Sequence, residues 1–142
     1  MKRVDRKSDC AINFSLEAFG DPWSLLIVRD MVFYHKATFG EFMASDERIG
    51  TNTLSRRLAD LESQGIITKH PSKIDKRKDR YMLTDKGLAL VPILVALTEW
   101  GAAYDPHTGA SPDHVEAMQT DRTAFIKATQ AEALQAYEPA LK

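Results

Sequence analysis

One predicted helix, from about Thr51 to Gln64, carries hydrogen-bonding side chains on one side and leucines on the other. The leucines recur at a spacing that places them on a single core-facing stripe, Leu54, Leu58 and Leu61. The side chains off this stripe, or at its edge, are Thr51, Asn52, Ser55, Arg56 and Arg57. Arginine bonds guanine at two points and asparagine does the same with adenine, whereas hydroxyl groups suit phosphates or mixed base edges. The pattern therefore predicts that this helix contacts DNA bases, led by its N-terminal turn.

A second group of polar residues is a run of cations in a predicted hairpin loop. The loop lies between two short strand candidates, residues 66–70 and 81–84, and its basic residues are Lys73, Lys76, Arg77, Lys78 and Arg80. A loop of this kind can touch the phosphate backbone while a helix reads the bases. A solvated hairpin would explain the polarity of the loop but not its excess of positive charge. We interpret the loop as a second DNA contact.

Charge is distributed unevenly along the 142 residues, although the net charge is −1. Residues 51–86 carry nine Lys and Arg against five Asp and Glu, a balance of +4. Residues 105–142 have three against six, a balance of −3. Such a distribution is typical of a protein whose anionic partner touches only the middle segment. Charge alone fits a solvated face equally well.

Other elements are predicted to position these residues. Helices are expected over residues 9–19 and 23–33, and a third opens at the capping box Thr38-Phe39-Gly40-Glu41. A turn at residues 46–50 precedes the fourth helix, and Gly65 ends it. After the hairpin, a long helix covers residues 85–104, with a kink near 88–92 because Pro92 lies inside it. A linker follows, and one last helix begins at Ser111.

This order predicts a mainly α fold with a small β-hairpin (α+β), a winged helix-turn-helix domain with dimerising terminal helices. Residues 1–104 form the DNA-binding domain, including the long dimerisation helix at about 85–104. Residues 105–142 form a linker and a C-terminal helical extension.

In order and spacing, several short patterns resemble the HxlR-type branch of the MarR-like winged-helix regulators. They begin at Cys10 and end near Tyr104, about two thirds of the chain. The matching segments are 20–29 (GDPWSLLIVR), 39–42 (FGEF), 54–67 (LSRRLADLESQGII), 81–87 (YMLTDKG) and 99–100 (EW). The resemblance implies a homodimeric transcriptional regulator, usually a repressor of its own or a neighbouring gene. It also implies a recognition helix at 51–61 and a wing at 72–80. The wing is more charged than is usual in the family, and the helix after Ser111 extends beyond the family's usual end.

A homodimer is also expected from the long helix. Its apolar stripe, with Trp100 at its end, exceeds what a small winged domain needs to cover. A two-fold dimer would bury the stripe and place two recognition helices roughly 34 Å apart, which matches a palindromic operator. The last helix either enlarges this interface or forms the wall of a pocket.

Cys10 is a candidate redox sensor. The resemblance implies that a cysteine at this position senses oxidants or electrophiles. With a single cysteine in the chain, only a bridge between the Cys10 residues of two subunits or a mixed thiol adduct is available. Arg6 and Lys7 favour the thiolate, but an inert, buried thiol fits the sequence as well.

A candidate pocket for a small aromatic effector is predicted from Phe14, Trp23 and Trp100, between the first helices and the long helix. Core and dimer contacts are the alternative roles of the two tryptophans.

Several function classes lack support in the sequence. It contains no nucleophile motif, phosphate loop or paired acid and base, and its four histidines lack the spacing of a metal site. We therefore expect no catalysis, metal or cofactor. No signal peptide or membrane span is expected either, so a cytoplasmic protein is predicted. The alternatives to a DNA-binding regulator are a winged-helix protein-interaction module and a small enzyme.

Overall fold

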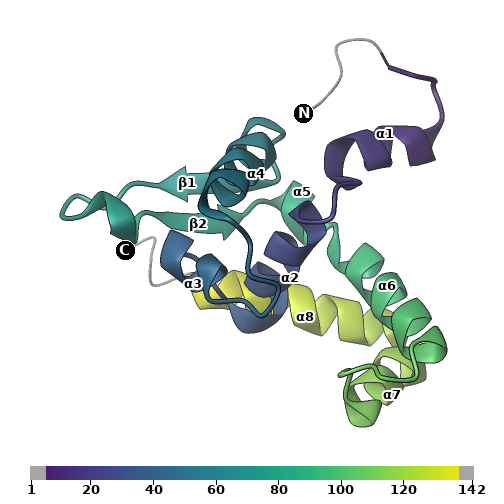
Figure 1. The fold of residues 1–142 in the computed structure, drawn as a ribbon. Coiled ribbons are helices and arrows are strands. Elements are labelled where there is room, and N and C mark those ends of the chain that lie inside the picture. The colour runs from purple at the N-terminus through teal and green to yellow at the C-terminus, as the bar shows by residue number, and fades with distance from the viewer. Residues whose placement is uncertain (1–5, 138–142) are drawn as a thin grey trace.

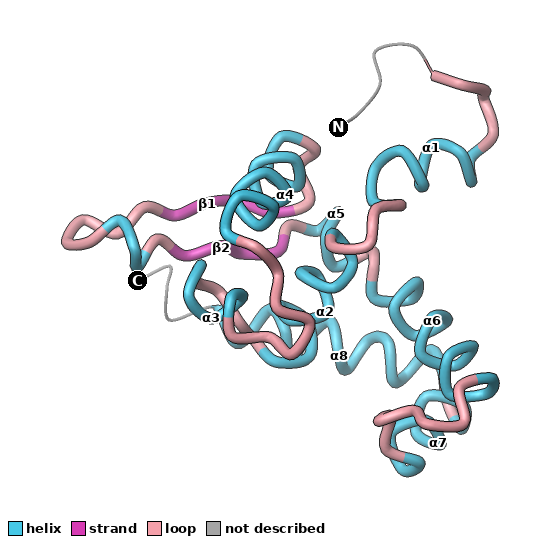
Figure 2. The backbone as a smooth tube through the Cα atoms, in the orientation of Figure 1, coloured by secondary structure: helices cyan, strands magenta, loops and turns pink. Residues whose placement is uncertain are grey.

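The computed structural model of the chain describes residues 6–137, except for the side chain of Lys76. In this part of the chain, helices pack beside one short hairpin, whose loop projects from one side of the molecule (Figures 1 and 2). The elements are α1 (Ala11–Phe19), α2 (Ser24–Tyr34), α3 (Phe39–Met43), α4 (Thr51–Ser63), β1 (Ile67–His70), η1 (Lys76–Lys78), β2 (Arg80–Leu83), α5 (Asp85–Leu88), α6 (Val91–Tyr104), α7 (Pro112–Thr120) and α8 (Arg122–Tyr137). The predicted mainly helical fold with one hairpin is confirmed.

The apolar helix α2 is the centre of the core. Asp21 caps it by accepting hydrogen bonds from the backbone N–H groups of Trp23 and Ser24, both at 2.9 Å. Val28 and Met31 are fully buried. Helices α4, α6 and α8 and strand β2 all pack against α2. The apolar run in the sequence therefore forms the buried helix that it predicts.

The hairpin follows α4 directly. Gly65 ends α4 with a φ of 73°, a backbone conformation that glycine adopts at little cost. Strands β1 and β2 pair antiparallel, from Ile67 opposite Leu83 to His70 opposite Arg80. Both predicted strands are confirmed, with ends that differ by one residue. The loop between them, residues 71–79, is the wing.

The predicted long helix is interrupted at residues 89–90. Pro92 lies in the first turn of α6, where its missing N–H leaves no helical carbonyl unpaired. The expected kink is therefore present, as a break between α5 and α6. The segment Asp85–Tyr104 is long and apolar enough to cross a membrane by length and composition alone. Since Val91 and Val95 are fully buried in the core, we interpret it as part of the packed fold.

The prediction of one helix after Ser111 is wrong, because the chain forms two. The backbone leaves the helical conformation at Asp121 (φ −146°, ψ 88°), whose side chain then accepts a hydrogen bond from the Ala124 N–H at 3.1 Å. The same aspartate thus ends α7 and caps α8. Both helices fold back onto the core, where Met118 and Tyr137 are fully buried.

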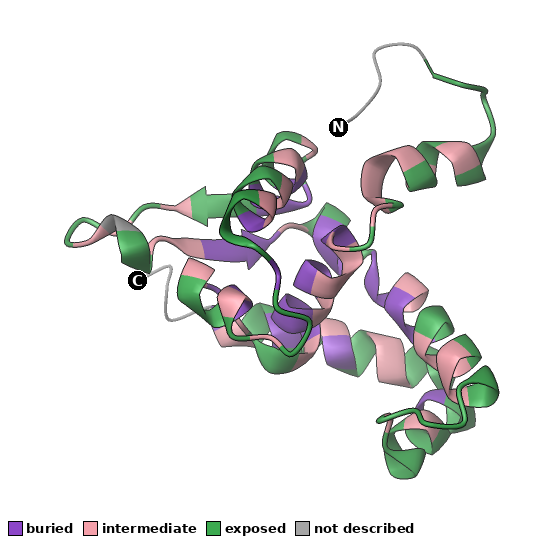
Figure 3. Cartoon of the chain, viewed as in Figure 1, coloured by how far each residue is buried: buried purple, intermediate pink, exposed green. Residues whose placement is uncertain are grey.

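Helix α1 is packed differently from the other helices. It contributes no buried residue, and its apolar side chains Ile12 and Leu16 are largely exposed. In Figures 1 and 3 it extends away from the body of the molecule. An apolar helix in this position has a face still available for packing.

Candidate nucleic-acid interface

Helices α3 and α4 form the helix-turn-helix. The capping box at the start of α3 is present: Thr38 Oγ1 accepts from the Glu41 N–H at 3.3 Å, and Glu41 Oε1 accepts from the Thr38 N–H at 3.0 Å. Burial of Glu41 would raise its pKa, but hydrogen bonds from the Ala37 backbone and from Thr38 outweigh this and lower it. The predicted start of α3 is therefore confirmed, with an ionised carboxylate as its cap.

The turn between α3 and α4 sets the direction of α4. Arg48 is the left-handed residue in this turn, with a φ of 57°, whereas Gly50 is extended. The turn predicted over residues 46–50 is therefore present, and its left-handed residue is Arg48. Ile49 is buried and anchors the turn to the core immediately before α4 begins.

Helix α4 presents the two faces that the leucine spacing predicts. Leu54, Leu58 and Leu61 are buried. The exposed face holds Thr51, Asn52, Ser55 and Arg56. In the described part of the chain, the side chains of these four residues have no hydrogen bond or ion pair, so they are available to an external partner.

Arg57 has a different environment from Arg56. Its side chain is only 18% exposed, with Nε 3.3 Å from Asp21 Oδ2 and Nη1 3.5 Å from Asp60 Oδ2. These contacts tie α4 to the start of α2. Arg57 therefore positions the helix, although the sequence groups it with the DNA-contacting residues.

The wing contains both free and paired charges. Lys73, Arg77 and Lys78 are exposed, and Arg77 Nη2 lies 3.1 Å from Asp75 Oδ2. Asp79 is drawn inward, since it accepts from the Ser72 N–H at 2.8 Å. The Lys76 side chain lies outside the described part of the chain.

Arg80 does not belong to the tip of the wing. It is the first residue of β2 and is half-buried, and its Nε has no hydrogen-bond acceptor within the described part of the chain. Burial raises the pKa of Tyr137 and the charge of Arg80 partly opposes this rise, whereas at Glu41 the same charge adds to a lowered pKa. The exposed cations of the wing thus end at Lys78.

The structure brings the wing and α4 together. Ser55 of α4 and Arg77 of the wing line a single cleft of about 610 Å³, together with Phe39 and Tyr81. The exposed face of α4 and the wing therefore meet at this cleft, which Glu62 and Asp79 also line. We call the following exposed side chains of these two elements the basic face: Thr51, Asn52, Ser55, Arg56, Lys73, Arg77 and Lys78.

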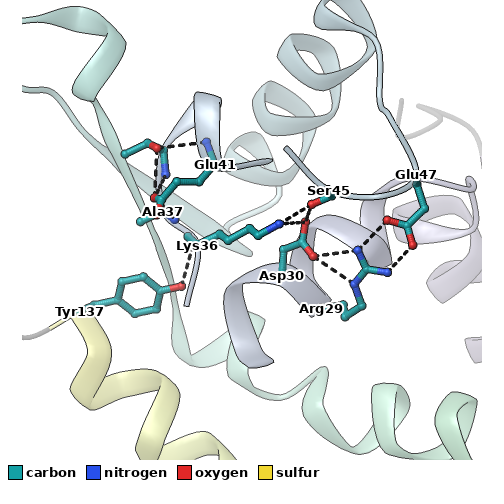
Figure 4. A network of polar contacts seen from close by, with 9 residues as sticks. Arg29, Asp30, Lys36, Ala37, Glu41, Ser45, Glu47 and Tyr137 are labelled. Carbon is teal, nitrogen blue, oxygen red and sulfur yellow. Dashed lines mark hydrogen bonds and ion pairs between the residues drawn. The ribbon is translucent and has the colours of Figure 1, made fainter. Parts of the chain in front are cut away.

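A network of charged and polar side chains connects α2 to the segments on either side of α3 (Figure 4). Arg29 of α2 donates two hydrogen bonds to Glu47 in the turn, at 2.6 and 2.9 Å, and it also bonds Asp30. Asp30 is only 3% exposed and accepts from the hydroxyl of Ser45. Lys36 Nζ lies 3.8 Å from the same carboxylate and 2.6 Å from the Ser45 hydroxyl. We call these five residues the brace.

The pKa values of Arg29 and Glu47 show that the ion pairs of the brace are strong. The hydrogen bonds from Arg29 lower the pKa of Glu47 from 4.5 to about 2. The bonds to Glu47, followed by those to Asp30, raise the pKa of Arg29. Sequence reasoning missed the brace. The one signal in the sequence was the adjacent charged pair Arg29-Asp30 inside an otherwise apolar helix. Charged side chains are rarely buried unless they are paired.

The remaining candidate residues lie away from the basic face. Cys10 is exposed at the start of α1, where the backbone N–H groups of Asn13 and Ile12 lower the pKa of its thiol. Phe14 packs under the Arg6 guanidinium, 5.3 Å from the ring centre. Trp100 is 69% exposed and contacts Tyr104.

Trp23 lines a small cavity with Leu26, Ile27 and Phe42, and neither Phe14 nor Trp100 takes part in that cavity. No group of three or more His, Cys, Asp or Glu side chains suited to a metal occurs among residues 6–137.

Comparison with known proteins identifies the family of this chain. The family model described as HxlR-like helix-turn-helix matches residues 18–108. An uncharacterised HTH-type transcriptional regulator of Methanothermobacter thermautotrophicus is 32% identical over 98 residues, which cover 69% of this chain and 74% of that protein. One from Mycobacterium tuberculosis is 33% identical over 102 residues, which cover 72% of this chain and 63% of that protein. The matched region thus amounts to less than two thirds of the mycobacterial protein.

Solved structures show the same fold. PA1607, a candidate transcription factor, is 38% identical with a TM-score of 0.64, over 75% of this chain and 72% of that chain. The redox regulator HypR in its oxidised form is 28% identical with a TM-score of 0.59, over 66% of this chain and 96% of that chain. The matched family and relatives are transcriptional regulators and not enzymes. The chain belongs to the HxlR-like helix-turn-helix family and is a DNA-binding transcriptional regulator.

Proposed function

We propose that this regulator binds a palindromic operator as a homodimer and represses transcription there. The observation that carries the proposal is the basic face, whose side chains on α4 have no partner in the described chain. A repressor is the simplest assignment, because a dimer bound across promoter DNA blocks access to it. We further propose that the protein works in the cytoplasm, where its DNA is.

Base recognition falls to the first turns of α4. Asn52 and Arg56 are four residues apart, so they share one face of the helix and can reach base edges in the same major groove. Thr51 and Ser55 flank them and suit phosphate oxygens. The more distant part of α4 carries Glu62, which would be repelled by phosphate, so only the N-terminal turns enter the groove.

The wing supplies the phosphate contacts. Lys73, Arg77 and Lys78 are exposed, and Arg77 lines the same cleft as Ser55 of α4. Each phosphate that they neutralise adds affinity and makes binding more sensitive to salt. Lys76 is proposed as a fourth contact from its place in the sequence.

Two helices favour a homodimer. On α1, Ile12 and Leu16 are exposed, and on α6 so are Leu97, Trp100 and Tyr104. An apolar surface of this extent is usually covered in the functional assembly. We propose that a second copy covers it about a two-fold axis, which would direct both basic faces toward one duplex.

Cys10 is proposed as a redox switch of this dimer. The thiol is exposed and its pKa is lowered, so the reactive thiolate forms more readily. Two Cys10 thiols would form one disulfide, and the two electrons and two protons they lose would pass to an oxidant such as a peroxide or quinone. A mixed adduct with an electrophile is the other route. The aromatic effector pocket at Phe14, Trp23 and Trp100 stays a prediction.

The decisive experiment selects bound sequences from random duplex DNA and measures affinity for them against salt. We expect a palindromic sequence to be enriched. Replacing Lys73, Arg77 and Lys78 by Ala should reduce the slope of log affinity against log salt by about 0.9 for each phosphate that is no longer neutralised. Lys127→Ala on α8, far along the chain from the basic face, is the control. If no sequence is retained even at low salt, the fold serves as a protein-interaction module.

The dimer and the switch need separate tests. Trp100→Glu should shift the protein toward monomer in sedimentation equilibrium, whereas Ile74→Glu in the exposed wing should not. Oxidant should weaken operator binding by the wild type and leave Cys10→Ser unaffected. A variant that responds like the wild type would remove Cys10 from the mechanism.

A further inference from the structure

A wide cleft lies between α2, the 105–111 loop and α8. Its volume is about 1070 Å³, and its lining includes the end of α2, residues 109–111 and one face of α8. The family match ends at residue 108, so residues 109–111 of this loop and both C-terminal helices lie beyond it. The cleft therefore lies between the shared winged helix and the C-terminal helices.

One wall of the cleft is aromatic. The ring of His114 contacts Phe33 of α2 and Phe125 of α8 edge-on, with ring centres 5.6 and 5.3 Å apart. All three side chains line the cleft, and the exposed Tyr34 does so as well. Aromatic side chains from three separate elements thus converge on one space. Their ring faces attract organic cations as well as apolar groups.

The polar lining of the cleft has an excess of carboxylates. Asp46, Glu47 and Glu132 line it, against Arg29 as the single Lys or Arg. Arg29 is already engaged by Glu47 at 2.6 Å, whereas the carboxylates of Asp46 and Glu132 have no hydrogen bond or ion pair among residues 6–137. Thr129 also lines the cleft, is only 7% exposed, and its hydroxyl has no hydrogen bond within that same range. The site therefore offers negative charge and a free hydroxyl beside aromatic rings.

We propose that this cleft binds a small organic cation, a protonated or quaternary amine with an aromatic body. The aromatic rings would pack against the body of the ligand, and the carboxylates of Asp46 and Glu132 would neutralise its charge. Known small-molecule sites occupy about 300–1000 Å³, and this cleft of about 1070 Å³ is slightly larger and more polar than most of them. An anionic ligand of the same shape would meet carboxylates and be rejected.

The cleft is connected to the helix-turn-helix. Asp46 and Glu47 belong to the turn before α4, and Arg29 holds Glu47 in the brace (Figure 4). At the far end of α8, the Tyr137 hydroxyl lies 3.1 Å from the Met31 carbonyl oxygen and 3.2 Å from that of Lys36, next to α3. A bound cation would compete with Arg29 for Glu47 and so alter the turn that directs α4. Ligand binding would then change operator affinity, a consequence that rests on the proposed function.

Calorimetric titration of the full chain tests the site without DNA. The probes are 4-phenylbutylammonium and 4-phenylbutanoate, which share a phenyl body and differ in the sign of their charge. We expect one ammonium ion per chain to bind at least about tenfold more tightly than the carboxylate. Glu132→Gln should weaken ammonium binding about tenfold, the scale of one charge-assisted contact. Glu116→Gln, on the exposed surface of α7 and outside the cleft, is the matched control.

The outcomes separate this inference from the proposed function. Equal affinity for the two probes, or a Glu132→Gln variant that binds like the wild type, overturns the site. Asp46→Asn, in an exposed turn, provides a second variant if Glu132→Gln fails to fold. DNA affinity is then measured with the ammonium ion at saturation. Calorimetric binding with no change in operator affinity would overturn the coupling, whereas failure to bind any DNA would contradict the proposed function and leave the cleft intact.

Discussion

The basic face and the brace contain the same kinds of side chain but use them in opposite ways. On α4, Asn52 and Arg56 point outward without partners in the described chain. In the brace, each charged group is paired. Asp30, for example, accepts hydrogen bonds from both Arg29 and Ser45. Paired charges define a position, and unpaired ones remain available to a ligand. Between α4 and the brace, the pairing of a charged side chain, more than its type, thus separates positioning residues from candidate contact residues.

Two adjacent residues show this difference within a single helix. Arg56 and Arg57 are identical in type, but one helical step turns their side chains about 100° apart. Arg56 remains on the exposed face, whereas Arg57 reaches Asp21 and Asp60. Whether a basic residue on α4 acts on DNA or on the fold depends on this rotation.

The largest expected effect is the loss of Asp30 from the brace. Asp30→Ala removes the carboxylate that pairs with Arg29 and Lys36 and leaves their charges without a buried partner, which should cost about 3 kcal/mol in free energy of unfolding. Urea denaturation followed by circular dichroism measures it. Asp46→Ala, a nearby aspartate outside the brace, should change stability by less than about 0.5 kcal/mol. If both variants are equally stable, pairing does not distinguish the two regions.

Replacing each of the two adjacent arginines, Arg56 and Arg57, by alanine sharpens the comparison. Arg56→Ala should weaken binding to the selected operator by about 1–3 kcal/mol, the value of a two-point base contact, with little change in stability. Arg57→Ala should instead lower the free energy of unfolding by about 1 kcal/mol, because a partly buried ion pair is removed. Fluorescence anisotropy with operator and non-operator DNA, beside urea denaturation, measures both. An equal drop in affinity on every sequence would reassign Arg56 to a phosphate contact.

A smaller effect is expected where α8 reaches the brace. Tyr137→Phe removes the hydroxyl that bonds the Met31 and Lys36 carbonyls while keeping the buried ring. The free energy of unfolding should fall by about 1 kcal/mol, the usual net value of one hydrogen bond. Tyr34→Phe, at an exposed tyrosine, is the control and should melt like the wild type. Equal melting temperatures for all three proteins would mean that this bond contributes nothing to stability.

The smallest effect is expected in the pH dependence of the free energy of unfolding. Because the pKa of Glu47 falls from 4.5 to about 2 on folding, its pair with Arg29 stabilises the fold fully above about pH 4.5. This contribution is lost as the pH falls from about 4.5 toward 2. Glu47 is 36% exposed, so the contribution should stay below about 1 kcal/mol. Thermal melts across this range should show a weaker pH dependence for Glu47→Gln than for the wild type, and parallel curves would contradict the assignment.

Features of the fold that depend on near neighbours were predictable from the sequence. The Thr38–Glu41 capping box, the leucine face of α4 and the break near Pro92 each follow from residues within about one helical turn. The hairpin follows from two apolar runs around a polar loop. The break at Asp121 was missed, although aspartate is a common helix cap, because apolar residues at helical spacing, Val115, Met118 and Phe125, continue across it.

The sequence by itself determined the element types, the two faces of α4 and the family, because periodicity and capping are local properties of the chain. Only the tertiary structure decided which charges are paired. Arg29 and Glu47 are 18 residues apart, Arg57 and Asp21 are 36 apart, and Tyr137 and Lys36 are 101 apart. No local pattern encodes such contacts, since they exist only after α2, α4 and α8 have packed together. The cleft beside α8 has the same origin, because its walls come from segments that meet only in the folded chain.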